Sequence, residues 1–221
     1  LNNQLNHLAN NDSVVVLAES TSNLYGENFI SCIDRTLERI YGKPEFFPET
    51  VITIGNSIIS KKLKQLLRKY NPTHHWHIEE TKRAQDVFSS ITHLIPIDPN
   101  QFFRQFNKNL KNKTSSTFGS SWKIEFDRSE RNHNLYLENC QWSDLKAHGL
   151  IYNLISNKNL NLQMGNSSSV RYIQLFKTLK NTIYKSNRGV SGIDGSSSTA
   201  IGAAECTSKI TLLVTGDLSF I

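Results

Sequence analysis

Short, unbroken apolar runs alternate with segments of helical apolar spacing, and this alternation restricts the fold more than any other feature of the chain. Strands buried on both faces, as in parallel sheets, carry unbroken runs of this kind. We predict strands at 14–18, 51–55, 75–78, 160–165, 182–184 and 210–216. Strands that alternate with helices favour an α/β fold with doubly wound parallel sheets.

The segments between the strands carry apolar residues three or four positions apart, which is typical of helices. We predict helices at 1–8, 29–40, 59–70, 99–110, 122–137, 143–154 and 170–179, and a polar loop at 111–116. Ser143 stands where an N-cap residue would begin its helix. Because a second series of strands and helices follows, we place a domain boundary after residue 142, which gives domains of 1–142 and 143–221.

Composition and cysteine spacing exclude several classes of protein. Hydrophobic residues make up 38% of the chain and charged residues 20%, a globular rather than a disordered balance. No apolar run approaches the ~20 residues that span a bilayer, and no signal sequence opens the chain, so we expect a cytoplasmic protein without a membrane span. Cys32, Cys140 and Cys206 are widely spaced, which favours buried reduced thiols over disulfides or a zinc site. The chain has no initiator Met and stops straight after a strand-like run, so we expect it to be truncated at both ends.

Two polar clusters each admit a functional and a structural interpretation. The net charge of +6 and the basic helix at 59–70 would suit nucleic acid, but leucines on the other face of that helix indicate an ordinary amphipathic helix, and we expect no nucleic-acid partner. His75 and His77 share one face of a predicted strand, close to Glu79 and Glu80, whereas His74 points away. No further cluster completes a metal site, so we favour polar packing at the edge of a sheet.

The loop at 187–200 is the most informative stretch for function. Glycines at 189, 192 and 195 precede small residues that open a helix, where main-chain N–H groups approach and stabilise an anion. The pattern is neither GxGxxG nor a Walker motif, so nucleotide binding is disfavoured.

Two further motifs follow predicted strands. Asp217 comes directly after the apolar run at 210–216, where its carboxylate suits a Mg²⁺ ion that bridges to phosphate, although a simple turn explains the residue equally well. Ser167 opens a helix after the strand at 160–165, with Arg171 one turn later. Arg171 and Arg188 could together hold a carboxylate substrate, because arginine binds carboxylates through two parallel hydrogen bonds.

In this order, the motifs resemble one enzyme family. They are Gly-Asn-Ser-x-x-Val-Arg at 165–171, Asn-Arg-Gly-x-Ser-Gly-Ile-Asp-Gly at 187–195 with its continuation Ser-Thr-Ala-x-Gly at 198–202, and Thr-Leu-Leu-Val-x-Gly-Asp-Leu-Ser-Phe at 211–220. They are similar to consecutive signatures of the MenD family, the thiamine-diphosphate-dependent 2-succinyl-5-enolpyruvyl-6-hydroxy-3-cyclohexene-1-carboxylate synthases. Residues 16–24 and 54–64 resemble the middle domain of that family, so the resemblance covers nearly the whole chain.

The resemblance implies a transferase of menaquinone biosynthesis. It implies thiamine diphosphate and Mg²⁺, or Mn²⁺ in its place, as cofactors, and 2-oxoglutarate and isochorismate as substrates: the first loses carbon dioxide, and its four-carbon unit is added to the second. Residues 1–142 would be the middle domain and 143–221 the start of the diphosphate-binding domain. The intact enzyme would be a homodimer or a homotetramer.

By motif match, Ser167, Arg171 and Arg188 would bind substrate carboxylates. The cofactor-binding residues would be Gly192, Ile193, Gly216 and Asp217, with Ile193 as the apolar wedge under the bent cofactor and Asp217 as a metal ligand.

No catalytic residue is assigned, because the family's activating glutamate and a later Mg²⁺-binding asparagine match nothing in these residues. We therefore expect the fragment alone to be inactive. Two alternatives stay open: an inactive binding or assembly module, and another thiamine-diphosphate enzyme such as an acetohydroxyacid synthase or a 2-oxoacid decarboxylase.

Overall fold

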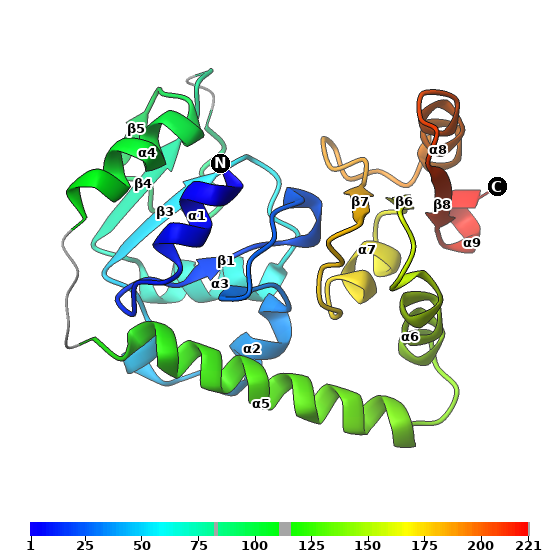
Figure 1. Ribbon diagram of the computed structural model, residues 1–221, viewed down its shortest axis with the longest axis horizontal. Helices are drawn as coiled ribbons and strands as arrows, with labels where there is room; N and C mark the ends of the chain where they lie inside the picture. Colours follow the sequence, from blue (N-terminus) through cyan, green and yellow to red (C-terminus); the bar gives the residue numbers. More distant parts are fainter. Residues whose placement is uncertain (82–83, 111–115, 221) are drawn as a thin grey trace. The chain divides into compact units, whose positions relative to one another are not determined.

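The structure, a computed structural model, describes residues 1–81, 84–110 and 116–220 (Figure 1). It contains two compact units. Unit 1 comprises Leu1–Leu17 and Tyr25–Ser129, and unit 2 comprises Ala18–Leu24 and the chain from Glu130 onward. The short segment Ala18–Leu24 therefore belongs to a different unit from the residues on either side of it.

Unit 1 is built on parallel strands. β3 (Thr50–Ile54), β4 (His74–Ile78) and β5 (His93–Ile95) form a sheet with β4 in the centre, and β1 (Val16–Leu17) pairs with β2 (Phe29–Ile30) in a second, two-stranded sheet. The helices of this unit and its 3-10 turn are α1 (Asn2–Leu8), α2 (Ile33–Ile40), η2 (Pro44–Phe46), α3 (Lys61–Tyr70) and α4 (Pro99–Asn109).

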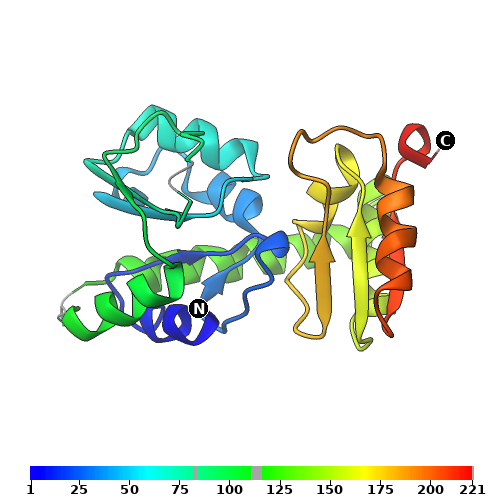
Figure 2. The same cartoon turned by 90° about the horizontal axis from the view of Figure 1, so that it is seen from above.

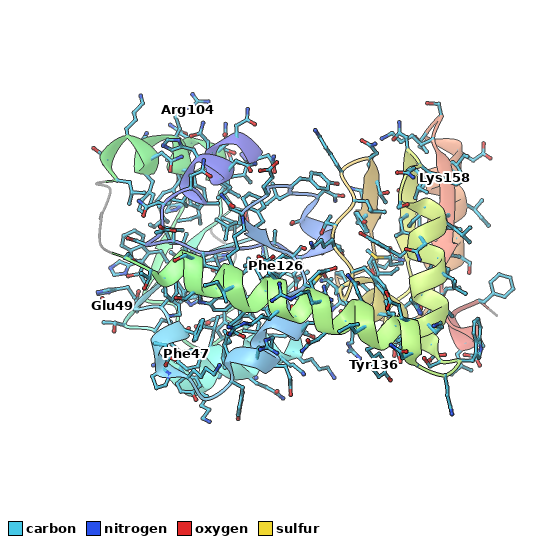
Figure 3. The ribbon with its side chains drawn as sticks, turned by 60° about the horizontal axis from the view of Figure 1, so that its bottom comes forward. Phe47, Glu49, Arg104, Phe126, Tyr136 and Lys158 are labelled. Atoms are coloured by element: carbon cyan, nitrogen blue, oxygen red, sulfur yellow. The ribbon has the colours of Figure 1, made fainter. Side chains whose placement is uncertain are left out.

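The core of unit 1 follows from the helical spacing of its apolar residues. Ile33, Leu37 and Ile40 of α2 are buried on one face, and the leucines of α3 pack in the same cluster. The first half of α5 (Phe118–Asn139) adds Trp122 and Phe126, the latter labelled in Figure 3. The indole N–H of Trp122 also donates to the carbonyl of Phe46 over 3.2 Å.

Unit 2 contains a fully parallel sheet of three strands. The order is β7-β6-β8, with β6 (Leu160–Met164) between β7 (Thr182–Lys185) and β8 (Ile210–Val214). Every residue of β6 is buried, as its central position requires. The second half of α5, η1 (Ser20–Ser22), α6 (Asp144–Ile155), α7 (Ser168–Ile173), α8 (Ser196–Glu205) and α9 (Asp217–Phe220) complete the unit.

The inserted segment Ala18–Leu24 covers the outer edge of β7. The Asn23 side chain donates to the carbonyl of Tyr184 over 3.0 Å and accepts from its N–H over 2.7 Å. At Tyr184, this side chain makes the two main-chain hydrogen bonds that a neighbouring strand would make. Asn23 adopts a left-handed conformation with φ 53°, which Asn tolerates better than most residues. The N–H of Ser20 donates to Gln174 over 2.9 Å. These contacts explain why the segment belongs to unit 2.

The expectation of an α/β fold with parallel sheets is confirmed. Some local predictions were wrong. Phe29 lies in strand β2 rather than in a helix, the helix predicted at 170–179 ends at Ile173, and the short strand β5 was not foreseen. Of the loop predicted at 111–116, only Ser116 lies among the described residues.

The cysteines and the helices bear on two further expectations. All three cysteines are thiols, but only Cys32 is buried, whereas Cys140 is half-buried and Cys206 exposed, so the prediction of buried thiols was wrong for two of them. Among the residues that the structure describes, no helix has both the length and the apolar character to cross a membrane.

Candidate functional site

The three motifs singled out in the sequence follow β6, β7 and β8 of one parallel sheet. Figure 2 shows β6 and β7 pointing to the same end of unit 2, where the loop after β7 lies. The chain runs from β6 to β7 on one side and then crosses β6 to reach β8 on the other. Such a reversal creates a crevice beyond the carboxyl ends of the two strands that flank it, here β6 and β8, and ligands of doubly wound sheets bind there.

Gly165 and Thr215 line this point where the connections reverse. The N–H of Gly165 donates to the carbonyl of Val214 over 2.8 Å, which holds the ends of β6 and β8 together. A Cβ atom on Gly165 would lie 2.6 Å from Oγ1 of Thr215 and 3.1 Å from its Cα, so only glycine fits. The Thr215 hydroxyl oxygen is buried and has no hydrogen-bond partner within the described ranges.

Ser167 and Arg171 lie on α7, directly after β6. Ser167 is exposed, its hydroxyl makes no capping hydrogen bond, and its main chain has a φ of 68°. A positive φ is costly for serine, and such strain is concentrated at functional positions. Arg171, one turn later, is also exposed, while Ser169 and Val170 between them are buried and anchor the helix.

Arg188 is half-buried on the loop after β7. Burial lowers the pKa of its guanidinium, Glu19 opposes that shift, and the positive charge of Arg171 adds to it. The structure therefore brings Arg171 and Arg188 close enough for their charges to interact. Two cations held near each other make a site that a carboxylate would stabilise.

Two residues of this site were missed from the sequence. Asn166 is 4% exposed, and its Oδ1 accepts from Nη1 of Arg188 over 2.7 Å. Glu19 is 9% exposed and reaches the site through the inserted segment Ala18–Leu24. The Gly-Asn-Ser motif contained a signal for Asn166, because a polar residue directly after a fully buried strand needs internal partners. Glu19 lies within residues 16–24, which resemble the middle domain of the family, but that resemblance gave it no role at this site.

The wedge candidate Ile193 and the metal-ligand candidate Asp217 lie on segments that are joined by hydrogen bonds. The carbonyl of Ile193 accepts from the Ser219 hydroxyl of α9 over 2.6 Å, and the carbonyl of Ser219 accepts from Ser197 over 3.4 Å. The side chain of Ile193 is 38% exposed, which is high for isoleucine, so it is available to contact a ligand. Its neighbour Gly192 is half-buried.

Asp217 is the first residue of α9 and is exposed. Its Oδ1 accepts from the N–H of Leu218 over 2.9 Å. A Cβ atom on Gly216 would meet nothing within 4 Å, so the main chain before Asp217 is open on that side. Mg²⁺ is commonly held by one or two carboxylates together with phosphate oxygens and water, and a single exposed carboxylate beside open main chain fits that donor set.

His75 and His77 of β4 in unit 1 are buried and hydrogen-bonded. Oγ1 of Thr53 lies 2.8 Å from both Nε2 of His75 and Nδ1 of His77, and both histidines are almost fully buried. Burial lowers the pKa of each imidazole, against the opposing charge of Asp86. Within 1–81, 84–110 and 116–220, no three His, Cys, Asp or Glu side chains gather as metal ligands. The expected polar packing is present, but on the central strand β4 rather than at an edge.

Comparisons with known proteins identify relatives of the chain. It is 42% identical over 219 residues to the 2-succinyl-5-enolpyruvyl-6-hydroxy-3-cyclohexene-1-carboxylate synthase of Flavobacterium psychrophilum, and 40% identical over 219 residues to that of Flavobacterium johnsoniae. The Porphyromonas gingivalis synthase is 37% identical over 214 residues. The chain is a homologue of these synthases. The family resemblance inferred from its motifs is thereby confirmed.

The similarity to the synthases covers almost all of this chain but only part of each relative. It includes 98% of the chain and 39% of each of the two Flavobacterium synthases, and 93% of the chain and 37% of the Porphyromonas gingivalis synthase. A search against models of protein families gives no match.

Proposed function

We propose that this chain is part of a thiamine-diphosphate- and Mg²⁺-dependent carboligase that decarboxylates 2-oxoglutarate and adds the four-carbon unit to isochorismate in menaquinone biosynthesis. One observation carries the proposal. The three motifs that resemble the synthases meet at the carboxyl end of one parallel sheet, at the point where its connections reverse. The similarity to named synthases along 98% of the chain supports the same conclusion.

In this proposal, Arg188, Arg171 and Ser167 bind substrate carboxylates. The guanidinium of Arg188 is oriented by Asn166 before any substrate arrives, which reduces the entropy lost on binding. The exposed Arg171 adds a second cation. Ser167 is also exposed and has a strained main chain, and its hydroxyl makes no capping hydrogen bond, so it is available to a substrate.

Gly192, Ile193, Gly216 and Asp217 form the cofactor-binding part of the proposal. Bound thiamine diphosphate would supply the carbanion chemistry of decarboxylation and carbon–carbon bond formation. Asp217 would hold Mg²⁺ against the diphosphate, with the open main chain of Gly216 beside it. Ile193 would offer its exposed side chain as an apolar surface beside the cofactor ring.

The proposal assigns no catalytic residue to these 221 residues, and we expect them alone to release no carbon dioxide from 2-oxoglutarate. Residues 1–142 as the middle domain, 143–221 as the start of the diphosphate-binding domain, a cytoplasmic location and assembly into a homodimer or homotetramer stay predictions.

Calorimetric titration of the chain with thiamine diphosphate and Mg²⁺ tests the assignment. We expect binding that requires the metal and is reduced at least tenfold by Asp217→Ala, since a carboxylate ligand of Mg²⁺ is lost. Asp144→Ala is the matched control, because Asp144 is also exposed in the first turn of a helix of unit 2. Absence of cofactor binding by the unaltered chain would reject the assignment and favour a binding or assembly module.

A further inference from the structure

Asn166 uses its whole side-chain amide within unit 2. The NH₂ group donates to the carbonyl of Asn187 over 2.7 Å and to that of Gly192 over 2.6 Å. The oxygen accepts from Nη1 of Arg188 over 2.7 Å and from the Ser186 hydroxyl over 3.3 Å. An asparagine amide offers two donors and two acceptor lone pairs, so its capacity is filled.

The partners of Asn166 define the orientation of the amide. Carbonyl oxygens only accept and a guanidinium only donates, so a flipped amide would place its oxygen against two carbonyls and its NH₂ group against Arg188. Asn166 is also 4% exposed, which makes every lost hydrogen bond costly. The contacts therefore hold the side chain in one orientation.

These hydrogen bonds join both ends of one loop to the end of β6. Asn187 and Arg188 follow β7 after Ser186, and Gly192 directly precedes Ile193. Between them, Ser191 has a φ of 57°, a conformation that an unsupported serine rarely adopts. A single buried amide thus supports the substrate-binding candidate Arg188 and the main chain next to the cofactor-binding candidate Ile193.

A second group in unit 2 interacts with Arg188 through its charge. The charge of Glu19 interacts with the guanidinium of Arg188, and Glu19 is held in unit 2 by the contacts of Ser20 with Gln174 and of Asn23 with Tyr184. The Nε atom of Arg188 is buried and has no hydrogen-bond partner in the described part of the chain. With Nη1 bonded to Asn166, Nε keeps an unused N–H donor that a ligand carboxylate could accept from.

We propose that Asn166 is a positioning residue that holds the Arg188 guanidinium and the main chain before Ile193 in one rigid arrangement, so that substrate and cofactor contacts are set together. This inference rests on the proposed function for the roles of Arg188 and Ile193. The positioning itself is a property of unit 2 and is measured without any ligand.

Two substitutions of Asn166 test separately its hold on the Arg188 guanidinium and its hold on the main chain before Ile193. Asn166→Ala removes all four hydrogen bonds. Asn166→Asp keeps the size of the side chain and the acceptor for Arg188, but it loses both donors and faces two carbonyls with a carboxylate. Asn161→Ala is the matched control, because Asn161 is a buried asparagine of β6, the strand before Asn166, and its side chain bonds Thr211 and Gln163 instead.

The measurement is nuclear magnetic resonance of the 221-residue chain with ¹⁵N-labelled arginine and glycine. In the unaltered chain we expect separate Nη signals for Arg188, since Asn166 hinders rotation of the guanidinium, and a rigid Gly192 amide with an order parameter of about 0.85. Asn166→Ala should merge the Nη signals and lower the Gly192 order parameter below about 0.6. Asn166→Asp should keep the Nη signals separate while Gly192 loosens, and Asn161→Ala should change neither.

The proposal is overturned if Asn166→Asp leaves Gly192 rigid, or if Asn161→Ala loosens Arg188 and Gly192 as much as the Asn166 variants do. If Asn166→Ala does not fold, Asn166→Asp decides. A titration with 2-oxoglutarate then separates the two levels of inference. The shift of the Arg188 Nε signal gives the affinity for 2-oxoglutarate. An affinity at least tenfold weaker for Asn166→Ala than for the unaltered chain supports a role of Asn166 in positioning Arg188 for substrate. No shift in any variant rejects Arg188 as the substrate group, while the ligand-free signals still decide whether Asn166 positions it.

Discussion

Replacing Asn23 should destabilise unit 2, although Asn23 lies more than a hundred residues before the strand that it supports. Asn23→Ala removes the hydrogen bonds to the N–H and carbonyl of Tyr184, which are 2.7 and 3.0 Å long. Each contributes about 0.5–1.5 kcal/mol net. Alanine at the φ of 53° adds about 1–2 kcal/mol of main-chain strain. The sum predicts a loss of about 2–5 kcal/mol.

Two milder substitutions of Asn23 divide the lost free energy between hydrogen bonds and strain, and hydrogen exchange shows where in the chain it is lost. Asn23→Gly keeps the left-handed main chain at little steric cost, so it should lose only the hydrogen-bond part, about 1–3 kcal/mol. Asn23→Asp keeps the acceptor for the Tyr184 N–H and should lose less. Urea unfolding gives the free energies, and exchange of the Tyr184 amide reports the site. Asn181→Ala, at an exposed position just before β7, is the control.

The reasoning is refuted if Asn23→Ala unfolds within about 0.5 kcal/mol of the unaltered chain, the range of ordinary surface substitutions, and the Tyr184 amide keeps its protection. If Asn23→Ala and Asn23→Gly lose the same free energy of unfolding, main-chain strain contributes nothing, and only the hydrogen-bond part of the argument stands.

Two further predictions concern Gly165 and the histidines. Gly165→Ala should destabilise unit 2 by about 1–3 kcal/mol in urea unfolding, because the new Cβ would meet Thr215 at 2.6 Å; Gly202→Ala, with open space around it, should instead be neutral or stabilising. Burial lowers the pKa of His75 and His77, so the unfolded state binds more protons. The contribution of these two histidines to the free energy of unfolding should therefore be fully present above about pH 6.5, the pKa of histidine in the unfolded chain. It should be lost as the pH falls below that value. His75→Asn should flatten that dependence in urea titrations between about pH 7 and 5, and an unchanged slope would contradict the assignment.

Elements with strong local patterns were predicted from the sequence, and those set by distant contacts were not. The apolar runs of β3, β6 and β8 and the Ser143 cap of α6 act within a few residues, and the structure contains them. β5 has only three residues, two of them exposed, so it has no apolar run to detect. His75 and His77 were expected to pack at an edge, whereas their strand β4 lies between β3 and β5.

The candidate site shows the same division. Strand ends and glycine spacing pointed to the segments that carry Ser167, Arg188 and Asp217, because parallel strands bring their carboxyl ends together. The orientation of Arg188 depends instead on Asn166, more than twenty residues earlier, and on Glu19 in another part of the chain. A motif can name a side chain that binds, but the groups that orient it are found only when the fold brings distant segments together.

The inserted segment links the stability of unit 2 to its chemistry. Ala18–Leu24 leaves unit 1 after Leu17 and returns to it at Tyr25, and in between it supplies both Asn23 to the edge of β7 and Glu19 to Arg188. The loop that carries Arg188 begins where β7 ends. Asn23 and the Ser20–Gln174 hydrogen bond therefore both hold the segment that carries Glu19 in unit 2. Unit 2 is thus complete only with a segment from the first twenty-five residues, and a division at residue 142 would separate Arg188 from the charge of Glu19.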